Sequence, residues 1–533
     1  MRAYVYYSVS MFRRLWLLVA LGFVLYLPAL PNHFVWDDEE QVVANTAVHT
    51  IANIPELFSG STFNSGGSAK LGGLYYKPLM SISFAIIYSI FGPSPWAFHL
   101  FQVGLHIGVV LLLYLIFCRI WKNKWLAFFV STLFLIHPQN VETVAYISSL
   151  QDTLYMFFGM LGLTWLIGRD KDINWHDLIF AGACLFLALL GKETGGLFGL
   201  IIGLYLFLYK KKLDVWHWAG VVTCVFVVYL YLRVGVAQVG LEKNMFTSMA
   251  TLPLLTRLGN IPAIVWHYLS QWIWPQYLSI SQHWANRQPG ILEWIELLGL
   301  VFGWLGILWW GLKRKDTNLV FFWVWFGLAI AFHVQIFPLD LTVADRWFYL
   351  PMVGLIGSMG SMGSMGYRVC SIKYGNIIIA IILFALFVRS SIRIQNWRDG
   401  LTLYKHDSQI MPNSFDLQNN LGVELYRSGD MKGAKEHFIR STEISPTWWT
   451  NWNNLGVIIE AEGDLDTALI YYRRSIDNGQ YYLAYGNYAR VLLKQKKWLE
   501  ARTFIENSLI LYPSNQVLLE TYQYLRINER QLQ

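Results

Sequence analysis

A run of four acidic residues follows the first hydrophobic segment of the chain. An almost wholly apolar stretch, residues 15–30, with two arginines before it, precedes Asp37, Asp38, Glu39 and Glu40. Because positive residues favour the cytoplasmic side, we expect the acidic run on the extracytoplasmic face. A carboxylate beside the bilayer can deprotonate an acceptor hydroxyl while a lipid-linked partner stays in the membrane. The alternative is that the run is the solvated end of a loop.

Cations and further ionisable residues occur on the same predicted side of the membrane. Lys77 in YYKPL and Arg346 in ADRWFYLP are the charges that a phosphate or pyrophosphate leaving group requires. Each is alternatively an interfacial anchor or an ion-pair partner. Ionisable groups beside a membrane are functional candidates by default. The other candidate site residues are His99, His106, Glu142, Asp152, Lys192, Glu193, Asp345 and Tyr349.

No cofactor follows with certainty from these residues. The acids together with His99 or His106 could coordinate a divalent metal, but no spacing in the sequence requires one. The four cysteines form no CxxC pair, and we interpret them as apolar packing residues, not as a disulfide framework or a zinc site.

The composition indicates a membrane protein. Of 533 residues, 55% are hydrophobic and only 14% are charged, whereas soluble domains carry about 25% charged residues. The net charge of +7 resides in short loops between apolar segments. We therefore interpret it as membrane orientation and predict no binding of nucleic acid.

The apolar segments predict about eleven membrane spans, since a span needs about 17–25 residues. Basic loops alternate with acidic ones, which places the N-terminus in the cytoplasm and the chain after about residue 391 outside. The predicted spans are 13–31, 96–117, 125–138, 152–168, 176–191, 194–209, 216–235, 291–312, 318–337, 346–366 and 374–390.

Two predicted outer loops are long. Residues 32–95 contain a Gly/Ser-rich stretch, Ser59 to Gly73, and then an apolar run before Pro93 that predicts an interfacial helix. Residues 236–290 contain an aromatic stretch suited to the headgroup layer. In the tenth span, GSMGSMGSMG predicts close helix packing, with a grip on lipid as the alternative.

From about residue 395 the chain becomes polar and repeats every 34 residues. Asn420-Leu421-Gly422 recurs as Asn454-Leu455-Gly456, and Ala434 recurs as Ala468. Small residues at these positions allow paired helices to cross, which is the tetratricopeptide pattern. We predict about three repeats and a half-repeat that begins at Trp397, forming a superhelix whose concave face binds peptides.

Taken in order, these segments resemble a known family. FVWDDEEQVVANTAV, YYKPLMSISFAIIYSIFGPSPWAFHLFQVGLH, HPQNVETVAYISSLQDTL, GKETG and ADRWFYLP, with repeats behind them, are similar to the transmembrane and tetratricopeptide repeat-containing proteins. That family belongs with the protein O-mannosyltransferases and the lipid A aminoarabinose transferases among the GT-C glycosyltransferases. The resemblance covers nearly the whole chain.

The resemblance implies a fold and a reaction. The expected fold is all-α, with a GT-C-type membrane domain at 1–394 and an extracytoplasmic tetratricopeptide α-solenoid at 395–533. The expected reaction is an inverting transfer of a sugar from a polyprenyl-phosphate-linked donor to a hydroxyl of a protein. Asp37 would be the base and Asp38 would orient the acceptor or a metal, while Lys77 and Arg346 would meet the donor phosphate.

Two other functions are compatible with the residues. The enzyme could modify a lipid or a cell-surface glycan, with the repeats recruiting partners, or the spans could only anchor a repeat scaffold. The sequence contains no Asn-X-Ser/Thr sequon. A lumenal domain in a eukaryote would often carry one, so we expect a bacterial inner membrane protein with periplasmic repeats. In a eukaryote the repeats would lie in the lumen of the endoplasmic reticulum.

Overall fold

The computed structural model consists of helices and loops, and the described residues contain no β-strand. They form two compact units, one within Met1–Ser59 and Tyr75–Asp399 and the other within Gly60–Leu74 and Gly400–Gln533. The expected all-α fold is therefore confirmed. The structure describes residues 2–62, 75–169, 173–210, 212–240, 247–365, 375–479, 481–513 and 515–532.

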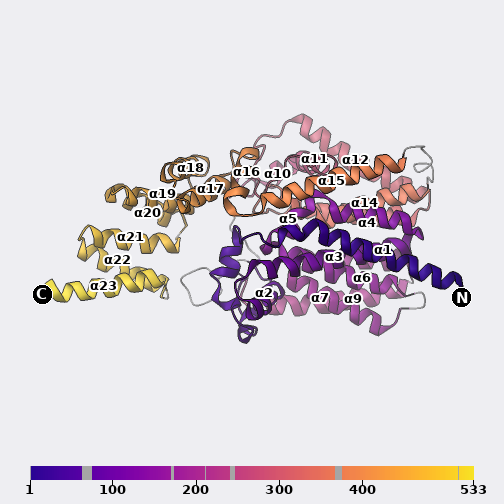
Figure 1. Ribbon diagram of the computed structural model, residues 1–533, viewed down its shortest axis with the longest axis horizontal. Coiled ribbons are helices and arrows are strands. Elements are labelled where there is room, and N and C mark those ends of the chain that lie inside the picture. Colours follow the sequence, from indigo (N-terminus) through magenta and orange to yellow (C-terminus); the bar gives the residue numbers. More distant parts are fainter. Residues whose placement is uncertain are drawn as a thin grey trace. The chain divides into compact units, whose positions relative to one another are not determined.

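The first unit is a bundle of helices connected by short helical turns. Helices α3, α6 and α7 run side by side (Figure 1). Helix α13 packs along α14. Its helices are α1 (Arg2–Tyr26), α2 (Pro78–Phe91), α3 (Pro95–Trp121), α4 (Lys124–Ile136), α5 (Val141–Ala145), α6 (Leu150–Ile167), α7 (Trp175–Gly191), α8 (Leu197–Tyr209), α9 (Lys212–Leu230), α10 (Leu254–Gly259), α11 (Ile261–Ile273), α12 (Ile291–Lys313), α13 (Thr317–Ala331), α14 (Tyr349–Met365) and α15 (Gly375–Asn396).

Five helical segments of the described chain are long and apolar enough to cross a bilayer, which makes the chain a multi-pass membrane protein. Five shorter apolar helices of 10–17 residues accompany them, so the count of about eleven spans stays a prediction. The five long segments are Met11–Ala29, Pro95–Trp121, Asp214–Val236, Ile291–Lys313 and Ile377–Asn396.

The glycine–serine repeat in α14 packs against neighbouring helices. A Cβ on Gly357 would lie 2.3 Å from the Phe322 ring, and a Cβ on Gly360 would lie 2.3 Å from the Trp121 ring. Real Cβ atoms do not approach so closely, so only small residues allow these aromatic rings to reach the backbone of α14. The contacts favour the packing interpretation of this repeat, whose last residue, Gly366, lies outside the described residues.

The two long loops contain helices of their own. The predicted helix in residues 32–95 is present as α2, and α10 and α11 lie within residues 236–290. Most of the Gly/Ser-rich stretch, together with Glu242 and Cys370, lies outside the described residues. The cysteines at 118, 184 and 224 are free thiols.

The second unit is a series of helix pairs. Consecutive pairs are α17 with α18, α19 with α20, and α21 with α22, and the first helix of each pair is 13 residues long. These helices are α16 (Gly400–Ile410), α17 (Phe415–Arg427), α18 (Met431–Ile444), α19 (Trp449–Ala461), α20 (Leu465–Gly479), α21 (Tyr482–Lys494), α22 (Trp498–Leu511) and α23 (Gln516–Leu532).

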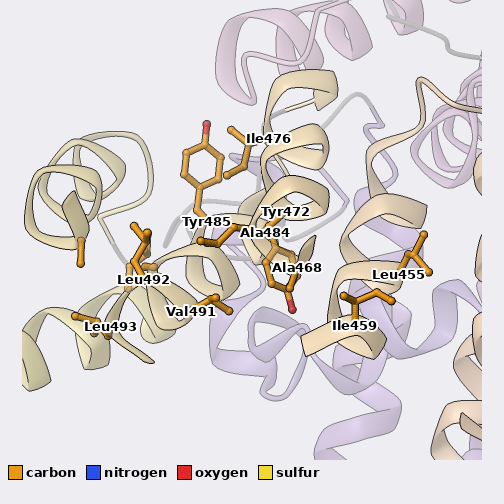
Figure 2. Close-up of a cluster of buried hydrophobic side chains, with 14 of the residues drawn as sticks. Leu455, Ile459, Ala468, Tyr472, Ile476, Ala484, Tyr485, Val491, Leu492 and Leu493 are labelled. Atoms are coloured by element: carbon orange, nitrogen blue, oxygen red, sulfur yellow. The ribbon is translucent and has the colours of Figure 1, made fainter. Parts of the chain in front are cut away.

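The 34-residue period explains how these helix pairs fold. Between the helices of the first two pairs, Gly429 and Gly463 adopt φ of +90° and +91°, a left-handed conformation that glycine reaches without strain. A Cβ on Gly456 would lie 2.7 Å from Cε1 of Tyr472, so the glycine is required where α19 crosses α20. Figure 2 shows the apolar side chains of α19, α20 and α21, including Leu455 and Ala468, that form the buried core.

The predicted domain boundary lies close to the division between the two units. The expected boundary at 394/395 falls inside α15, and the division between the units follows Asp399. Trp397, expected to begin a half-repeat, is fully buried in the first unit, with its ring 5.5 Å from that of Tyr146. This aromatic contact is long-range, so the repeat pattern gave no sign of it.

Candidate functional site

The acidic run directly follows a strained residue and is anchored by its second carboxylate. Trp36 has φ of +53°, a left-handed conformation that is unusual for a residue with a bulky side chain. Asp38 is fully buried. Its Oδ2 accepts a hydrogen bond from the Val35 N–H at 3.0 Å, and its Oδ1 accepts bonds from the Ser148 N–H at 2.7 Å and the Ser148 hydroxyl at 2.6 Å. Asp38 therefore ties this loop to the segment that follows α5.

Asp37 is a partly exposed residue, whereas its neighbour Asp38 is buried. Burial raises the pKa of Asp37, whereas the Tyr146 hydroxyl beside it and the charges of Arg346 and Lys77 lower the pKa. The Trp36 ring stacks on the Tyr146 ring, with centroids 6.2 Å apart and planes at 26°. The fold therefore gathers a carboxylate, a phenol and two cations from four separate segments.

Arg346 is held by a buried carboxylate. It lies in a short 3-10 turn, Asp345–Phe348, directly before α14. Its guanidinium forms an ion pair with Glu142, whose side chain is 1% exposed, and its backbone N–H donates to Glu142 Oε2 at 3.3 Å. The guanidinium also lies over the ring of Tyr146, 6.0 Å from the centroid. Two predicted site residues thus form one unit, in which Glu142 positions Arg346.

Lys77 precedes α2 and is almost fully buried. Its ammonium lies over the Tyr75 ring, 4.3 Å from the centroid, and the Tyr75 hydroxyl donates to Asp340 Oδ2 at 3.0 Å. The Asp340 charge, burial, and the charges of Asp37 and Glu193 all raise the pKa of the Tyr75 hydroxyl. Tyr75 therefore connects the surroundings of Asp37 with those of Glu193.

Two further ion pairs involve the KE dipeptide between α7 and α8. Lys192 Nζ lies 2.6 Å from Asp152 Oδ1, and the Ser149 hydroxyl donates to the other oxygen of Asp152 at 3.2 Å. Glu193 pairs with Arg233 at 2.7 Å, and the Arg233 side chain is only 5% exposed. Arg233 lies in a π-helical turn, Tyr231–Val236, a type of distortion that is frequent at functional sites.

His106 and Tyr349 bond each other inside the helix bundle. The Tyr349 hydroxyl lies 2.6 Å from Nδ1 of His106, and Nε2 of His106 lies 3.3 Å from the Leu135 carbonyl oxygen. All of these polar atoms are buried. His106 and Tyr349 therefore form a polar link between α3, α4 and α14. His99, near the start of α3, and Asp345 are buried as well.

No metal site is evident among the residues that the structure describes, since no three His, Cys, Asp or Glu side chains there are grouped closely enough to hold an ion.

A surface hollow of about 590 Å³ lies beside the acidic run and is lined in part by Glu39. Its lining consists of His33, Phe34, Glu39, Val43, Ala44, Pro93 and Pro95.

Comparison with known proteins gave three informative relatives. The chain is 23% identical to the protein O-mannosyl-transferase F38B6.6 of Caenorhabditis elegans, over 82% of this chain and 63% of that protein. It is 21% identical to TMTC3 of Mus musculus, over 82% of this chain and 51% of that protein. It is 31% identical to Tmtc1 of Drosophila melanogaster, over 33% of this chain and 20% of that protein.

The predicted resemblance to the transmembrane and tetratricopeptide repeat-containing family is confirmed. The chain spans only about half to two thirds of the length of the first two of these relatives. No family model matches the chain. The crystal structure of the APC/C hetero-tetramer Cut9–Hcn1 matches with a TM-score of 0.24 and 14% identity, over 87% of this chain and 79% of that chain.

Four of the segments that carry the family resemblance meet around Asp37. They supply the acidic run, Lys77, Glu142 and Arg346. Sequence reasoning missed Tyr146 and Ser148, although both lie within HPQNVETVAYISSLQDTL. An ordinary tyrosine and serine carry no sign of function until the fold places them against the acidic run.

Proposed function

We propose that this protein is a membrane glycosyltransferase that moves a sugar from a polyprenyl-phosphate-linked donor to a Ser or Thr hydroxyl of a protein. The observation that carries the proposal is that Asp37, a partly exposed residue, lies within the electrostatic reach of Lys77 and Arg346. A base beside two cations fits an acceptor hydroxyl and a phosphate leaving group. The names of the relatives support transfer to proteins and make mannose the first sugar to test.

The proposed reaction is a single displacement. Asp37 takes the proton of the acceptor hydroxyl while that oxygen attacks the anomeric carbon of the sugar. The bond from this carbon to the phosphate oxygen breaks, and the lipid phosphate leaves with the electron pair. Attack opposite the leaving group inverts the anomeric configuration. Lys77 and Arg346 stabilise the charge that develops on the phosphate.

The surroundings of Asp37 suit a general base. Burial raises its pKa, which increases the basicity of the carboxylate, while the Tyr146 hydroxyl and the two cations favour its ionised form. Asp38 has both oxygens occupied by protein donors. We therefore assign Asp38 to holding the loop that carries Asp37, and not to contact with the acceptor.

We further propose that the acidic loop and the repeats lie on the extracytoplasmic side, with the N-terminus in the cytoplasm. In a bacterium this is the periplasmic side of the inner membrane, and in a eukaryote it is the lumen of the endoplasmic reticulum. The membrane domain, 1–394, would carry out the transfer, and the repeat domain, 395–533, would recruit the protein acceptor.

Replacement of the proposed base tests this function. Asp37→Asn should reduce transfer at least a hundredfold, because loss of general base catalysis typically costs 10²–10⁴-fold. The matched control is Glu40→Gln, which changes an exposed acid of the same run. Mass spectrometry of acceptor proteins from cells that express each variant measures the product. Full activity of a folded Asp37→Asn protein would refute the assignment.

The identity of the acceptor is tested separately. A chain that ends at Asp399, where the first unit ends, should lose modification of proteins if the repeats recruit them. Retained transfer to a lipid or glycan by that chain would instead favour a non-protein acceptor.

A further inference from the structure

Five asparagine side chains connect the first helices of the three repeats. Asn419 Nδ2 donates to Asn420 Oδ1 at 3.2 Å, and Asn454 Nδ2 donates to Asn419 Oδ1 at 2.9 Å. In the same way, Asn453 Nδ2 donates to Asn454 Oδ1 at 3.1 Å and Asn487 Nδ2 donates to Asn453 Oδ1 at 2.9 Å. We call this continuous chain of amides the asparagine ladder.

The ladder lies on the inner side of the repeats. Helix α17 contacts α19, and α19 contacts α21, so the first helices of successive pairs are neighbours. In stacked helix pairs, the helices that approach their counterparts in the next pair line the concave surface. The apolar core lies between the helices, as Figure 2 shows for α19, α20 and α21.

The ladder residues divide into a buried set and a partly exposed set. Asn419 and Asn453 are each 2% exposed, and each bonds two neighbouring amides. Asn420, Asn454 and Asn487 are partly exposed and come from three successive repeats. The buried amides therefore fix the orientation of three accessible ones.

The accessible amides keep hydrogen-bonding capacity for a ligand. A side-chain amide offers two N–H donors and two oxygen lone pairs. In the ladder Asn454 uses one N–H and one lone pair, so one of each remains. A donor and an acceptor on one planar group match the N–H and C=O of a peptide backbone.

We propose that the asparagine ladder binds the main chain of an extended polypeptide and hydrogen-bonds its backbone amides in preference to its side chains. Neighbouring helices lie about 8–10 Å apart, and an extended chain advances about 3.3 Å per residue. The partly exposed asparagines of successive repeats therefore meet about every third residue of the ligand. Such a ligand suits an unfolded acceptor segment, and in that respect the inference rests on the proposed function.

The experiment measures binding and does not require transfer. Fluorescence anisotropy of a labelled, unstructured Ser/Thr-containing 12-residue peptide is followed with the full chain in detergent. Asn454→Ala should weaken binding about tenfold, since its hydrogen bonds to the peptide backbone are lost. The matched control is Asn478→Ala, an exposed asparagine on α20 whose side chain donates to the Pro446 carbonyl.

Two altered peptides make the test independent of whether the variant folds. A peptide with scrambled sequence should bind within about twofold of the original, and a peptide with N-methylated central residues should lose binding. Weak binding of the scrambled peptide, unchanged binding of the N-methylated peptide, or unchanged binding by a folded Asn454→Ala protein would each overturn the proposal. The Asp37→Asn protein should bind the peptide as the wild type does. A failure of the transfer proposal is therefore distinguishable from a failure of the peptide-binding proposal.

Discussion

Asp38 and Asp37 are adjacent in the sequence, and the structure predicts that they fail in different ways when replaced. In Asp38→Asn, an amide group takes the place of one oxygen that now accepts hydrogen bonds from protein donors. The three donors are the Val35 N–H and the N–H and hydroxyl of Ser148. At least one of them must then face another donor within a fully buried site.

The cost follows from these contacts. A buried donor without a partner costs about 1–3 kcal/mol, so Asp38→Asn should lower the free energy of unfolding by about 2 kcal/mol at neutral pH. Because the loop also holds Asp37, a displacement of about 1 Å should lower kcat by up to about a hundredfold. KM for the donor should change less, because Asp38 contacts no cation of the site.

The pH dependence gives an independent check. Burial raises the pKa of Asp38 to about 7 in the folded protein, despite the bonds from Ser148 and Val35 that lower it, whereas the ordinary value is 3.8. The folded state therefore binds more protons than the unfolded state between these values, and wild-type stability rises as the pH falls through 7. The asparagine variant lacks this gain, so its deficit should grow by about 2 kcal/mol between pH 7 and pH 5.

The assay combines thermal unfolding in detergent at pH 7 and pH 5 with initial rates of transfer. Ser148→Ala removes one donor and should lower stability by about 1 kcal/mol. In the double variant the two losses should not add, because the Ser148 hydroxyl bonds to Asp38, and the coupling should be about 1 kcal/mol. Wild-type melting and wild-type kcat for Asp38→Asn, or strictly additive losses, would refute the reasoning.

Three further predictions concern the ion pair and the repeats. Arg346→Ala leaves the buried Glu142 carboxylate without its cation and should lower the free energy of unfolding by about 3–5 kcal/mol, measured by thermal unfolding. Arg346→Lys should melt at a higher temperature than Arg346→Ala. It should still transfer sugar at least tenfold more slowly than the wild type, because lysine lacks the planar guanidinium that makes two parallel hydrogen bonds. Partial burial raises the pKa of Glu460, but bonds from two cations and Tyr472 lower it to about 2; the repeats should lose stability as the pH falls from about 4.5 toward 2, and Glu460→Gln should flatten this loss in circular dichroism. Gly456→Ala forces a Cβ to within 2.7 Å of Tyr472 and should destabilise the repeats by about 1–3 kcal/mol in the same measurement.

The buried ion pairs position cations and are not a source of net stability. Glu142 and Asp152 are each 1% exposed and hold Arg346 and Lys192. Removing such carboxylates from water costs about as much as the pairing returns. The benefit is geometric, because each cation is held in one orientation before any ligand arrives.

The sequence by itself determined the features that depend on composition and local spacing. Hydrophobic runs require a membrane, a 34-residue period with small residues at helix crossings specifies stacked helix pairs, and acids and cations beside apolar segments indicate a candidate site. These patterns are local because they follow from burial and from the repeat of a helix. The sequence did not determine the number of membrane spans, since a short apolar helix can cross the membrane or lie at its interface.

Only the tertiary structure decided which partners surround each candidate residue. Asp38 bonds Ser148, 110 residues away, and Arg346 pairs with Glu142 across 204 residues. His106 and Tyr349, both predicted as candidate site residues, bond each other within the helix bundle. Residue type and spacing do not reveal such partners, because the fold brings distant segments together and whether a polar group anchors the protein or meets a ligand depends on which donors and charges then surround it.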